Sequence, residues 1–403
     1  MKGDAINLGE LIARQTPGWS LEQPFYLSAE LYAIECRGWL AKQWYVLGHS
    51  SELSLPGSYI VRELLQESLL LLRDKSGQLR GFYNVCRHRG SRLCTADGRT
   101  QRIVCPYHAW AYGLDGALET ARALPTGVDP SRLSLHPVAV AEIGGVILAS
   151  LGAEPSSLEE ARRCFEPGLQ YLELAGARIA ARRQYPTRAN WKLVMENFTE
   201  CYHCPASHPE YCRVMQHVDQ YGRDDPVKSA AWVREEARWL KADADSDSPL
   251  GAPDRDGVDA RYWAGRSPIG NGRLSQSQDG CPVAPLLGGQ KRFDGGVTAF
   301  VLRPFVYLLA ANDYATLFQF LPTGPESTDV VISWLVNGKA TDEAVDVDRM
   351  VWLWDVTTLQ DKVIVEQNAQ GVRSQAYTPG PYTTLESGSA RLVADYLAGL
   401  GEN

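Results

Sequence analysis

Short apolar runs separated by turn residues fill the first part of the chain after an N-terminal stretch of mixed polarity. The runs are 44–48, 58–61, 68–73, 81–85, 138–140 and 145–149, with turns at Pro56-Gly57 and at 74–77. Apolar runs of this length between glycine and proline turns predict short β-strands. The pattern therefore predicts a small all-β unit, and the residues up to about Leu40 have the mixed pattern of helices.

Longer apolar runs in the last third predict a second, larger β-structure. These runs are 297–302, 307–311, 315–321 and 329–336. A helical pattern then starts at Thr341 and continues to about Gln370, with Gly371 as a stop signal. We expect an antiparallel sheet that packs against this long helix, which is an α+β arrangement, and a helix-rich linker at 155–172 before it.

Residues 243–296 are rich in Asp, Ser, Gly and Pro, which is the composition of a loop. A long ordered loop in an enzyme is often a lid over the active site. The same composition is also typical of a disordered segment. Both interpretations remain open from the sequence.

Composition narrows the classes of function that the chain can have. The 403 residues carry a net charge of -8 and 44% hydrophobic residues. The charge gives no basic surface for nucleic acid, and no stretch of about 18 apolar residues is present that could cross a membrane. Nine cysteines, an odd number, without a signal peptide favour a reducing, cytoplasmic location.

Two Cys/His pairs stand close together in the predicted all-β unit. Cys86 and His88 are two residues apart, and Cys105 and His108 are three apart. Two thiolates and two imidazoles are the ligands of a Rieske [2Fe-2S] centre, in which two His replace two Cys on one iron. The alternative is a structural zinc site with the same four ligands, although a Cys-x-His pair is unusual for zinc.

A second group of histidines follows the motif Asn190-Trp-Lys. His203 and His208 are five residues apart, a spacing that suits two ligands of a 2-His-1-carboxylate iron site with open positions for oxygen and substrate. The stretch before Pro205 has a helical pattern that places Asn197, Glu200 and His203 on one face. Pro205 and Pro209 then bend the chain, so that His208 can reach the same metal.

The remaining histidines, His49, His136 and His217, lack such a context and are predicted to be structural. Cys201 and Cys204 form a Cys-x-x-Cys next to the same group. Beside a metal on a helix, we expect them to pack as small apolar side chains.

The third iron ligand is predicted on the C-terminal helix. Val351, Trp354, Thr358, Asp361 and Val365 fall on one stripe of that helix. An acid in such a stripe is costly unless it is paired or binds a metal, so Asp361 is the predicted ligand. The alternatives, Asp355 and Glu366, lie just outside the stripe.

These motifs together resemble those of the Rieske non-haem iron oxygenases, and within them the branch that oxidises and demethylates quaternary ammonium compounds. The resemblance implies a small Rieske domain inserted before a larger, helix-grip-like catalytic domain with an antiparallel sheet. The implied division is an N-terminal helical segment at 1–40 that packs on the catalytic domain, a Rieske domain at 41–153 and an iron-containing domain at 154–403.

The resemblance also implies roles for individual residues. Cys86, His88, Cys105 and His108 would bind the cluster, and His203, His208 and Asp361 would bind a mononuclear Fe(II). Glu200 would connect a neighbouring subunit's cluster to the iron, and Asn197 is a second predicted catalytic residue. Most of the family has Asp at the position of Glu200.

The implied reaction is an O2-dependent monooxygenation that demethylates a betaine-like compound. Electrons would come from NAD(P)H through a separate flavin and iron–sulfur reductase, and the subunits would form a homotrimer. An aromatic cage could hold the ammonium group, with Tyr202, Trp232, Trp263 and Tyr307 as candidate walls. Two alternatives remain: ring hydroxylation by a similar oxygenase, and a non-enzymatic electron carrier or zinc-stabilised binding protein.

Overall fold

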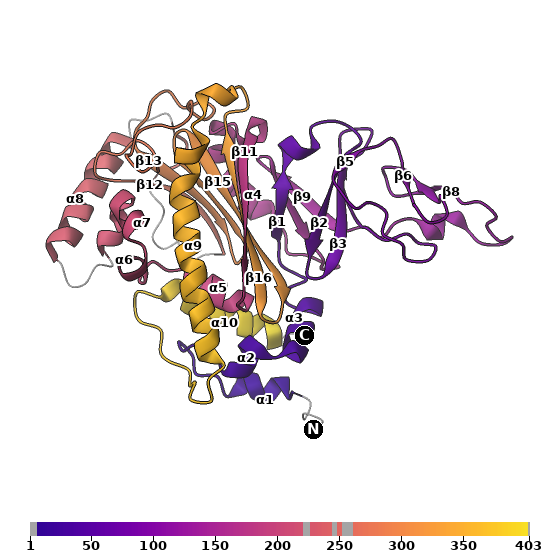
Figure 1. The fold of residues 1–403 in the computed structure, drawn as a ribbon, viewed down its shortest axis with the longest axis horizontal. Coiled ribbons are helices and arrows are strands. Elements are labelled where there is room, and N and C mark those ends of the chain that lie inside the picture. The colour runs from indigo at the N-terminus through magenta and orange to yellow at the C-terminus, as the bar shows by residue number, and fades with distance from the viewer. Residues whose placement is uncertain (1–5, 221–225, 244–247, 252–260, 402–403) are drawn as a thin grey trace.

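The chain folds into an N-terminal β-rich part and a larger α+β part, which lie side by side in the computed structural model (Figure 1). The structure describes residues 6–220, 226–243, 248–251 and 261–401. The α+β class expected from the sequence is confirmed, since the described chain combines antiparallel sheets with long helices.

Three small antiparallel sheets form the N-terminal part. Their strand orders are β1-β10-β9, β4-β3-β2-β5 and β6-β7-β8. The strands are β1 (Tyr45–His49), β2 (Ser58–Leu64), β3 (Glu67–Arg73), β4 (Leu79–Tyr83), β5 (Gly98–Arg99), β6 (Ile103–Val104), β7 (Ala111–Tyr112), β8 (Leu118–Thr120), β9 (Ala139–Ile143) and β10 (Val146–Ser150). The predicted runs therefore became strands, and Figure 1 shows the β6–β8 sheet at the end of the molecule far from the large helix α9.

One six-stranded antiparallel sheet, in the order β11-β16-β15-β14-β13-β12, is the centre of the larger part. Its strands are β11 (Arg178–Thr187), β12 (Tyr262–Pro268), β13 (Gly296–Leu302), β14 (Val306–Ala310), β15 (Tyr314–Gly324) and β16 (Ser327–Val336). The long helix α9 (Val347–Val372) crosses one face of this sheet (Figure 1).

The other face of the sheet is covered as well, by the N-terminal part. Gln319 of β15 donates from Nε2 to the carbonyl oxygen of Val46 in β1 at 3.0 Å. The Tyr45 ring stacks on Phe305 with 4.7 Å between centroids. A sheet that is buried on both faces needs nearly continuous apolar strands. This explains why polar and apolar residues do not alternate along β15 and β16.

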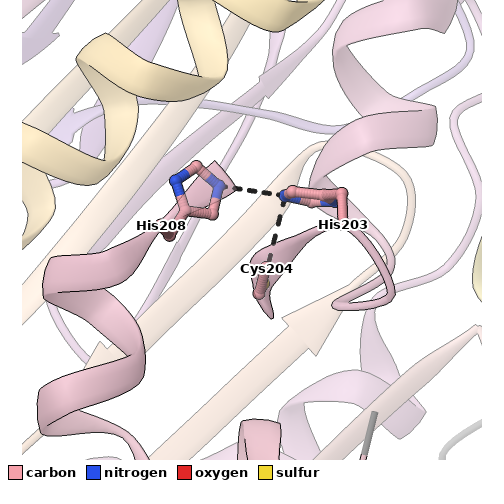
Figure 2. A group of neighbouring side chains, drawn as sticks. All are labelled: His203, Cys204 and His208. Carbon is pink, nitrogen blue, oxygen red and sulfur yellow. Dashed lines mark hydrogen bonds between the residues drawn. The ribbon is translucent and has the colours of Figure 1, made fainter. Parts of the chain in front are cut away.

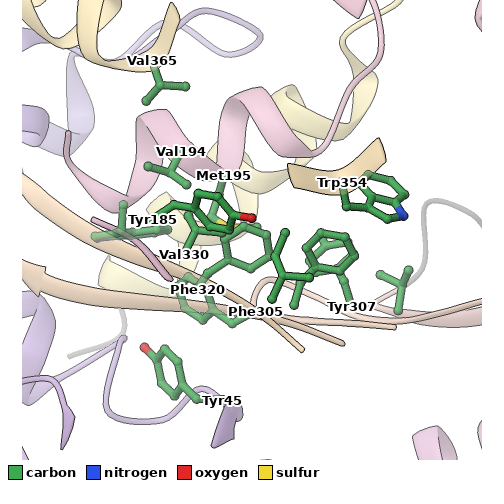
Figure 3. Packing of buried hydrophobic residues seen from close by; sticks show 14 of the residues in the cluster. Tyr45, Tyr185, Val194, Met195, Phe305, Tyr307, Phe320, Val330, Trp354 and Val365 are labelled. Atoms are coloured by element: carbon green, nitrogen blue, oxygen red, sulfur yellow. The ribbon is translucent and has the colours of Figure 1, made fainter. Parts of the chain in front are cut away.

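A dense aromatic core lies between the sheet and the α9 helix (Figure 3). Trp354 of α9 packs edge-on against Phe318 of β15 with 5.1 Å between ring centroids. Val351, Trp354 and Val365 are buried, as the predicted stripe requires. This packing fixes the rotation of α9, and with it the direction of every side chain on that stripe.

The remaining helices surround this core. They are α1 (Leu8–Ala13), α2 (Gln23–Leu27), α3 (Ala29–Arg37), α4 (Glu159–Tyr171), α5 (Trp191–Phe198), α6 (Cys204–Ser207), α7 (Pro209–Val214), α8 (Pro226–Asp243) and α10 (Ser387–Gly401). Among the described residues, none of the helices combines the length and apolarity needed to cross a bilayer.

The N-terminal helices pack on the larger part, although they are followed in sequence by the β-rich part. Trp39 stacks on Trp191 of α5 with 5.2 Å between ring centroids. Lys192 Nζ lies 2.6 Å from Glu35 Oε1 of α3, and both side chains are fully buried. Trp191 Nε1 also donates to Glu35 at 3.0 Å. The proposed boundaries at residues 40 and 153 are compatible with this packing and remain a prediction.

Three expectations about elements were wrong in detail. The long helix begins at Val347, because the residues from Asp342 to Ala344 form a separate 3-10 turn and Asp346 caps the helix. Gly371 does not end the helix, which continues to Val372. The described part of the supposed loop at 243–296 contains the β12 strand, which pairs with β13. The lid hypothesis also concerns 244–247 and 252–260, which lie outside the described residues.

We predict that the buried ion pair between Glu35 and Lys192 holds the N-terminal helices in place. Lys192→Met should lower the free energy of unfolding by about 3 kcal/mol, because it leaves a buried carboxylate without its cation. Urea unfolding of the purified protein measures this change. Arg391→Met breaks an exposed pair with Asp395 and should cost no more than about 0.5 kcal/mol. Equal losses in the two variants would contradict the prediction.

Candidate active site and cluster-binding loops

Two loops at the tip of the N-terminal part carry the first group of predicted ligands. Cys86 and His88 follow β4, and Cys105 and His108 lie between β6 and β7. Gly90 has a φ of 75°, which a glycine adopts without strain and which allows the first loop to turn. Both cysteines are 2% exposed, whereas both imidazoles are exposed.

The four side chains face one another across the two loops. The rings of His88 and His108 lie 4.8 Å apart between centroids. His88 stacks on Trp110 at 4.7 Å, and Tyr107 stacks on His108 at 3.9 Å. Buried thiols with exposed imidazoles fit a cluster that is anchored inside the domain by sulfur and reaches the surface through its histidine-bound iron.

A tyrosine hydroxyl lies against the first cysteine. Tyr112 Oη lies 3.2 Å from Cys86 Sγ and accepts a hydrogen bond from the Arg87 backbone N–H at 3.0 Å. The Tyr112 hydrogen is therefore free to point at the sulfur. Hydrogen bonds to cluster sulfurs raise the reduction potential, because they stabilise added negative charge.

The second group of predicted ligands follows the α5 helix, and here one expectation was wrong. The helix ends at Phe198, so Asn197, Glu200 and His203 do not share a helix face. The Glu200 carboxylate accepts hydrogen bonds from the backbone N–H groups of Tyr202 and His203, which stabilises a turn instead. Pro205 then stands in the first turn of α6, and Pro209 in that of α7.

The turn nevertheless brings the two predicted iron-binding histidines together (Figure 2). His203 Nε2 lies 3.1 Å from His208 Nε2, and Asp361 Oδ1 lies 3.0 Å from His208 Nε2 and 3.4 Å from His203 Nε2. Three ligands on one face of an octahedron, with bonds of about 2.1 Å, lie about 3.0 Å apart. The three donor atoms therefore fit a single metal ion bound on one face.

The outer nitrogen of each imidazole is held by a side chain that accepts a hydrogen bond. His203 Nδ1 lies 2.5 Å from Glu200 Oε1, and His208 Nδ1 lies 3.0 Å from Gln360 Oε1. Gln360 Nε2 in turn donates to Glu210 Oε2 at 2.7 Å. A proton on Nδ1 leaves Nε2 free as a ligand atom, and such partners also fix the ring orientation.

Charge and burial act in opposite directions on these groups. Burial disfavours a charged His203, but the carboxylates of Asp361 and Glu200 outweigh burial and raise the pKa of His203 to about 10. The same balance raises the pKa of His208. Burial would raise the pKa of Asp361, but hydrogen bonds from the two imidazoles lower it. The site therefore holds its carboxylate ionised and favours a bound cation.

The two alternative acids have other partners. Asp355 accepts a hydrogen bond from Tyr185 Oη at 2.7 Å and pairs with Arg183 at 2.5 Å. Glu366 pairs with Arg188 and Lys362. Neither carboxylate is therefore available to the histidines, and Asp361 is the acid that the structure places beside them.

The two cysteines near the histidines pack as predicted, since Cys204 belongs to the buried apolar core and Cys201 packs against that core. Cys204 is buried, but its Sγ lies 3.9 Å from His203 Nε2 (Figure 2). Cys201 Sγ lies 3.6 Å from His217 Nε2, and both cysteines line the cavity next to the histidines. Each thiol therefore has one polar neighbour in addition to its apolar packing. Cys204 is close enough to join His203 and His208 in a group of candidate metal donors.

A cavity of about 250 Å³ opens onto the three donor atoms. Of the four aromatic residues proposed as walls, Trp263 and Tyr307 line it, while Tyr202 and Trp232 do not. Tyr211, Trp354 and Arg303 line it as well, and the sequence analysis did not propose them as cavity walls. Trp354 could have been found, because it stands two turns before Asp361 on the same stripe. No sequence pattern marked Arg303 as a cavity residue, because it lies in a turn between two strands.

The comparisons with known proteins agree with this geometry. The family model of the ring hydroxylating alpha subunit (catalytic domain) matches residues 174–399, and that of the Rieske [2Fe-2S] domain matches residues 43–139. The chain is 35% identical over 397 residues to the glycine betaine monooxygenase oxygenase subunit of Chromohalobacter salexigens, which covers 96% of this chain and 87% of that protein.

Two further relatives extend the picture. The carnitine monooxygenase oxygenase subunit of Escherichia coli (strain K12) is 35% identical over 218 residues, which is 52% of this chain and 57% of that protein. A solved structure of the quaternary ammonium Rieske monooxygenase CntA with its substrate L-carnitine matches with a TM-score of 0.68 at 23% identity, over 98% of this chain and 99% of that one. The likeness to the solved CntA structure shows that the two proteins share a fold.

The chain therefore belongs to the Rieske non-haem iron oxygenases, and it is an oxidoreductase. Its cofactors are a Rieske [2Fe-2S] cluster and a mononuclear iron, with O2 as co-substrate; in this family NAD(P)H supplies the electrons through a reductase. This membership excludes the alternative of a zinc-stabilised binding protein or a simple electron carrier.

We predict that Asp361 is required for the mononuclear iron and not for the cluster. Asp361→Asn should reduce the iron content from about three to about two per chain while the visible absorbance of the cluster is retained. Elemental analysis and absorbance spectra of the purified variants measure this. Asp355→Asn removes an acid from the same helix and should keep about three irons. Loss of the cluster absorbance in Asp361→Asn alone would contradict the assignment.

We also predict that the Tyr112 hydroxyl tunes the cluster. Tyr112→Phe should lower the reduction potential by on the order of 50 mV, which is the equivalent of one hydrogen bond of about 1 kcal/mol. Redox titration of the cluster absorbance measures the shift. Tyr107→Phe keeps the ring that stacks on His108 and should leave the potential unchanged. An unchanged potential in Tyr112→Phe would show that the hydroxyl does not donate to the sulfur.

Proposed function

We propose that this protein is a monooxygenase that removes an N-methyl group from a quaternary ammonium compound such as glycine betaine. The observation that carries the proposal is the cavity of about 250 Å³, in which aromatic walls face three convergent metal donors. Relatives that are named for glycine betaine and carnitine support the same substrate class.

In this proposal Cys86, His88, Cys105 and His108 hold the cluster. The mononuclear iron is held by three other side chains, His203, His208 and Asp361. The iron, when bound, supplies the chemistry that activates O2. The chain supplies the geometry: Glu200 and Gln360 hold the two imidazoles with Nε2 directed at the metal position.

The overall reaction balances with two electrons. One N-methyl C–H bond and O2, with two electrons and two protons, give an N-hydroxymethyl group and water. The C–N bond of the hydroxymethyl group then breaks, which releases formaldehyde, a tertiary amine and one proton. The two electrons come from NAD(P)H through a separate flavin and iron–sulfur reductase.

The aromatic side chains of the cavity suit a methylated ammonium group. Tyr211 and Trp354 lie 5.7 Å apart between ring centroids, and Phe198 packs edge-on against Tyr307 at 4.9 Å. Aromatic faces attract a quaternary ammonium without offering it hydrogen bonds that it cannot make. The same walls would also hold an apolar ring, so ring hydroxylation is the alternative that an experiment has to exclude.

Electron transfer to the iron is proposed to cross between subunits. The cluster-binding loops beside β6 lie on the opposite side of the molecule from α6 (Figure 1). Glu200 lines both the iron cavity and a neighbouring cavity of about 400 Å³. A head-to-tail contact that closes into a homotrimer would bring the exposed His108 of one subunit near Glu200 of the next, and Glu200 would then bridge cluster and iron.

A cytoplasmic location completes the proposal. All nine cysteines are free, and free thiols in this number are typical of proteins kept in a reducing compartment. The free thiols therefore support a cytoplasmic location, and so does the proposed need for NAD(P)H, which is a cytoplasmic reductant.

We predict one formaldehyde for each NADH consumed when the holoenzyme turns over glycine betaine with a suitable reductase. Formaldehyde and dimethylglycine are measured against NADH in the same reaction. Choline oxidised at its alcohol carbon would consume NADH without formaldehyde, and benzoate or naphthalene would give a hydroxylated ring. If hydroxylated rings are formed and no betaine is turned over, demethylation is wrong and ring hydroxylation is the function.

A further inference from the structure

The sheet side of the iron cavity carries several hydrogen-bond donors that the ammonium group of the proposed substrate cannot satisfy. Trp263 of β12 pairs with Val301 of β13, and Val301 pairs with Tyr307 of β14. Residues that pair directly across antiparallel strands point to the same face. Trp263 and Tyr307 therefore flank Val301 on one face of the sheet, and all three line the cavity.

Two of these donors are buried and lack an acceptor. The Trp263 Nε1 atom and the Tyr307 Oη atom are both buried, and neither donates a hydrogen bond to a described residue. Tyr307 is only 7% exposed. An indole N–H can only donate, and a buried donor without an acceptor is costly to keep. Such a pair in a cavity wall indicates a ligand that accepts hydrogen bonds.

Arg303 adds a positive charge at the same place. It lies in the turn between β13 and β14 and lines the cavity. The Arg303 guanidinium is near enough to the Tyr307 hydroxyl to oppose the effect of burial, which raises the pKa of Tyr307. A guanidinium can only donate, so Arg303 offers the hydroxyl hydrogen of Tyr307 no acceptor. Among the described residues that line the cavity, Arg303 is the only arginine or lysine.

We infer that Arg303, Tyr307 and Trp263 form a carboxylate seat, and that the cavity therefore selects quaternary ammonium compounds that also carry a carboxylate. This inference rests on the proposed function and narrows its substrate class to zwitterions of the betaine type. A carboxylate offers about four acceptor positions and forms two parallel hydrogen bonds with a guanidinium. A trimethylammonium group offers none, and the hydroxyl of choline is neutral.

The seat also orients the substrate. The acids of the cavity, Glu200 and Asp361, come from its helical side and lie beside His203. The cation Arg303 comes from its sheet side. A zwitterion placed between them has its carboxylate repelled by the acids and held by Arg303, while its methylated nitrogen turns toward Asp361. An N-methyl group, and not the carbon next to the carboxylate, is then presented to the metal position.

Three ligands separate the two charges of a betaine. Glycine betaine carries both charges, tetramethylammonium carries only the cation, and tert-butylacetate carries only the carboxylate on a group of the same shape. Their dissociation constants are measured by calorimetry on the cluster- and iron-loaded protein without oxygen, so that no turnover occurs. Arg303→Met and Tyr307→Phe test the seat, and Tyr307→Phe removes only a hydroxyl if the first variant fails to fold.

We expect each variant to weaken glycine betaine and tert-butylacetate by about tenfold to a hundredfold, the usual range for a hydrogen bond to a charged group. Tetramethylammonium should change by less than about twofold. Arg261→Met is the matched control, because Arg261 is the backbone partner of Arg303 but bonds Ser156 with its guanidinium and does not line the cavity. It should alter none of the three constants.

The outcomes separate the two proposals. The seat is overturned if the variants weaken tetramethylammonium as much as glycine betaine, or if they weaken neither. In that case binding of both ammonium compounds by the unmodified protein would leave the proposed function intact. If the unmodified protein binds tert-butylacetate but no ammonium compound, the demethylation proposal fails instead.

Discussion

The convergence of His203, His208 and Asp361 on one point is the constraint on which the rest of the catalytic half depends. Two imidazole nitrogens and a carboxylate oxygen within 3.0 to 3.4 Å of one another are stable only when a positive charge balances them. Each imidazole is turned toward that point by one outer partner, Glu200 or Gln360. The ligands come from two distant parts of the chain, so the fold itself has to position them.

The large sheet performs this positioning because it is enclosed on both faces. The N-terminal β-rich part covers one face through Tyr45 and Val46, and the α9 helix covers the other through Trp354. Close packing on both sides leaves α9 little freedom to rotate, so Asp361 keeps its direction. The same sheet face presents Trp263 and Tyr307 to the cavity, and thus one surface supports both the metal ligands and the walls that a substrate meets.

Local patterns predicted most of the elements and the ligand types. The cluster-binding loops could be predicted because Cys86-Arg-His88 and Cys105-Pro-Tyr-His108 each contain two metal donors within four residues. Asp361 was readable because an acid in an apolar helical stripe needs a partner. The continuation of α5 past Phe198 was mispredicted, since the backbone N–H groups of Tyr202 and His203 donate hydrogen bonds to the Glu200 carboxylate, and these bonds compete with helix geometry. β12 was missed because its partner strand, β13, lies about thirty residues away.

The sequence by itself determined the ligand chemistry and the class of fold, because spacing within a few residues decides which donors can share a cluster or a helix stripe. Only the tertiary structure decided which residues line the cavity. Arg303 and Tyr211 have no local pattern that marks them, and Trp263 and Tyr307 became neighbours through the register of three strands. Strand pairing and helix docking join residues that are distant in the chain, so these contacts cannot be predicted from a local sequence pattern.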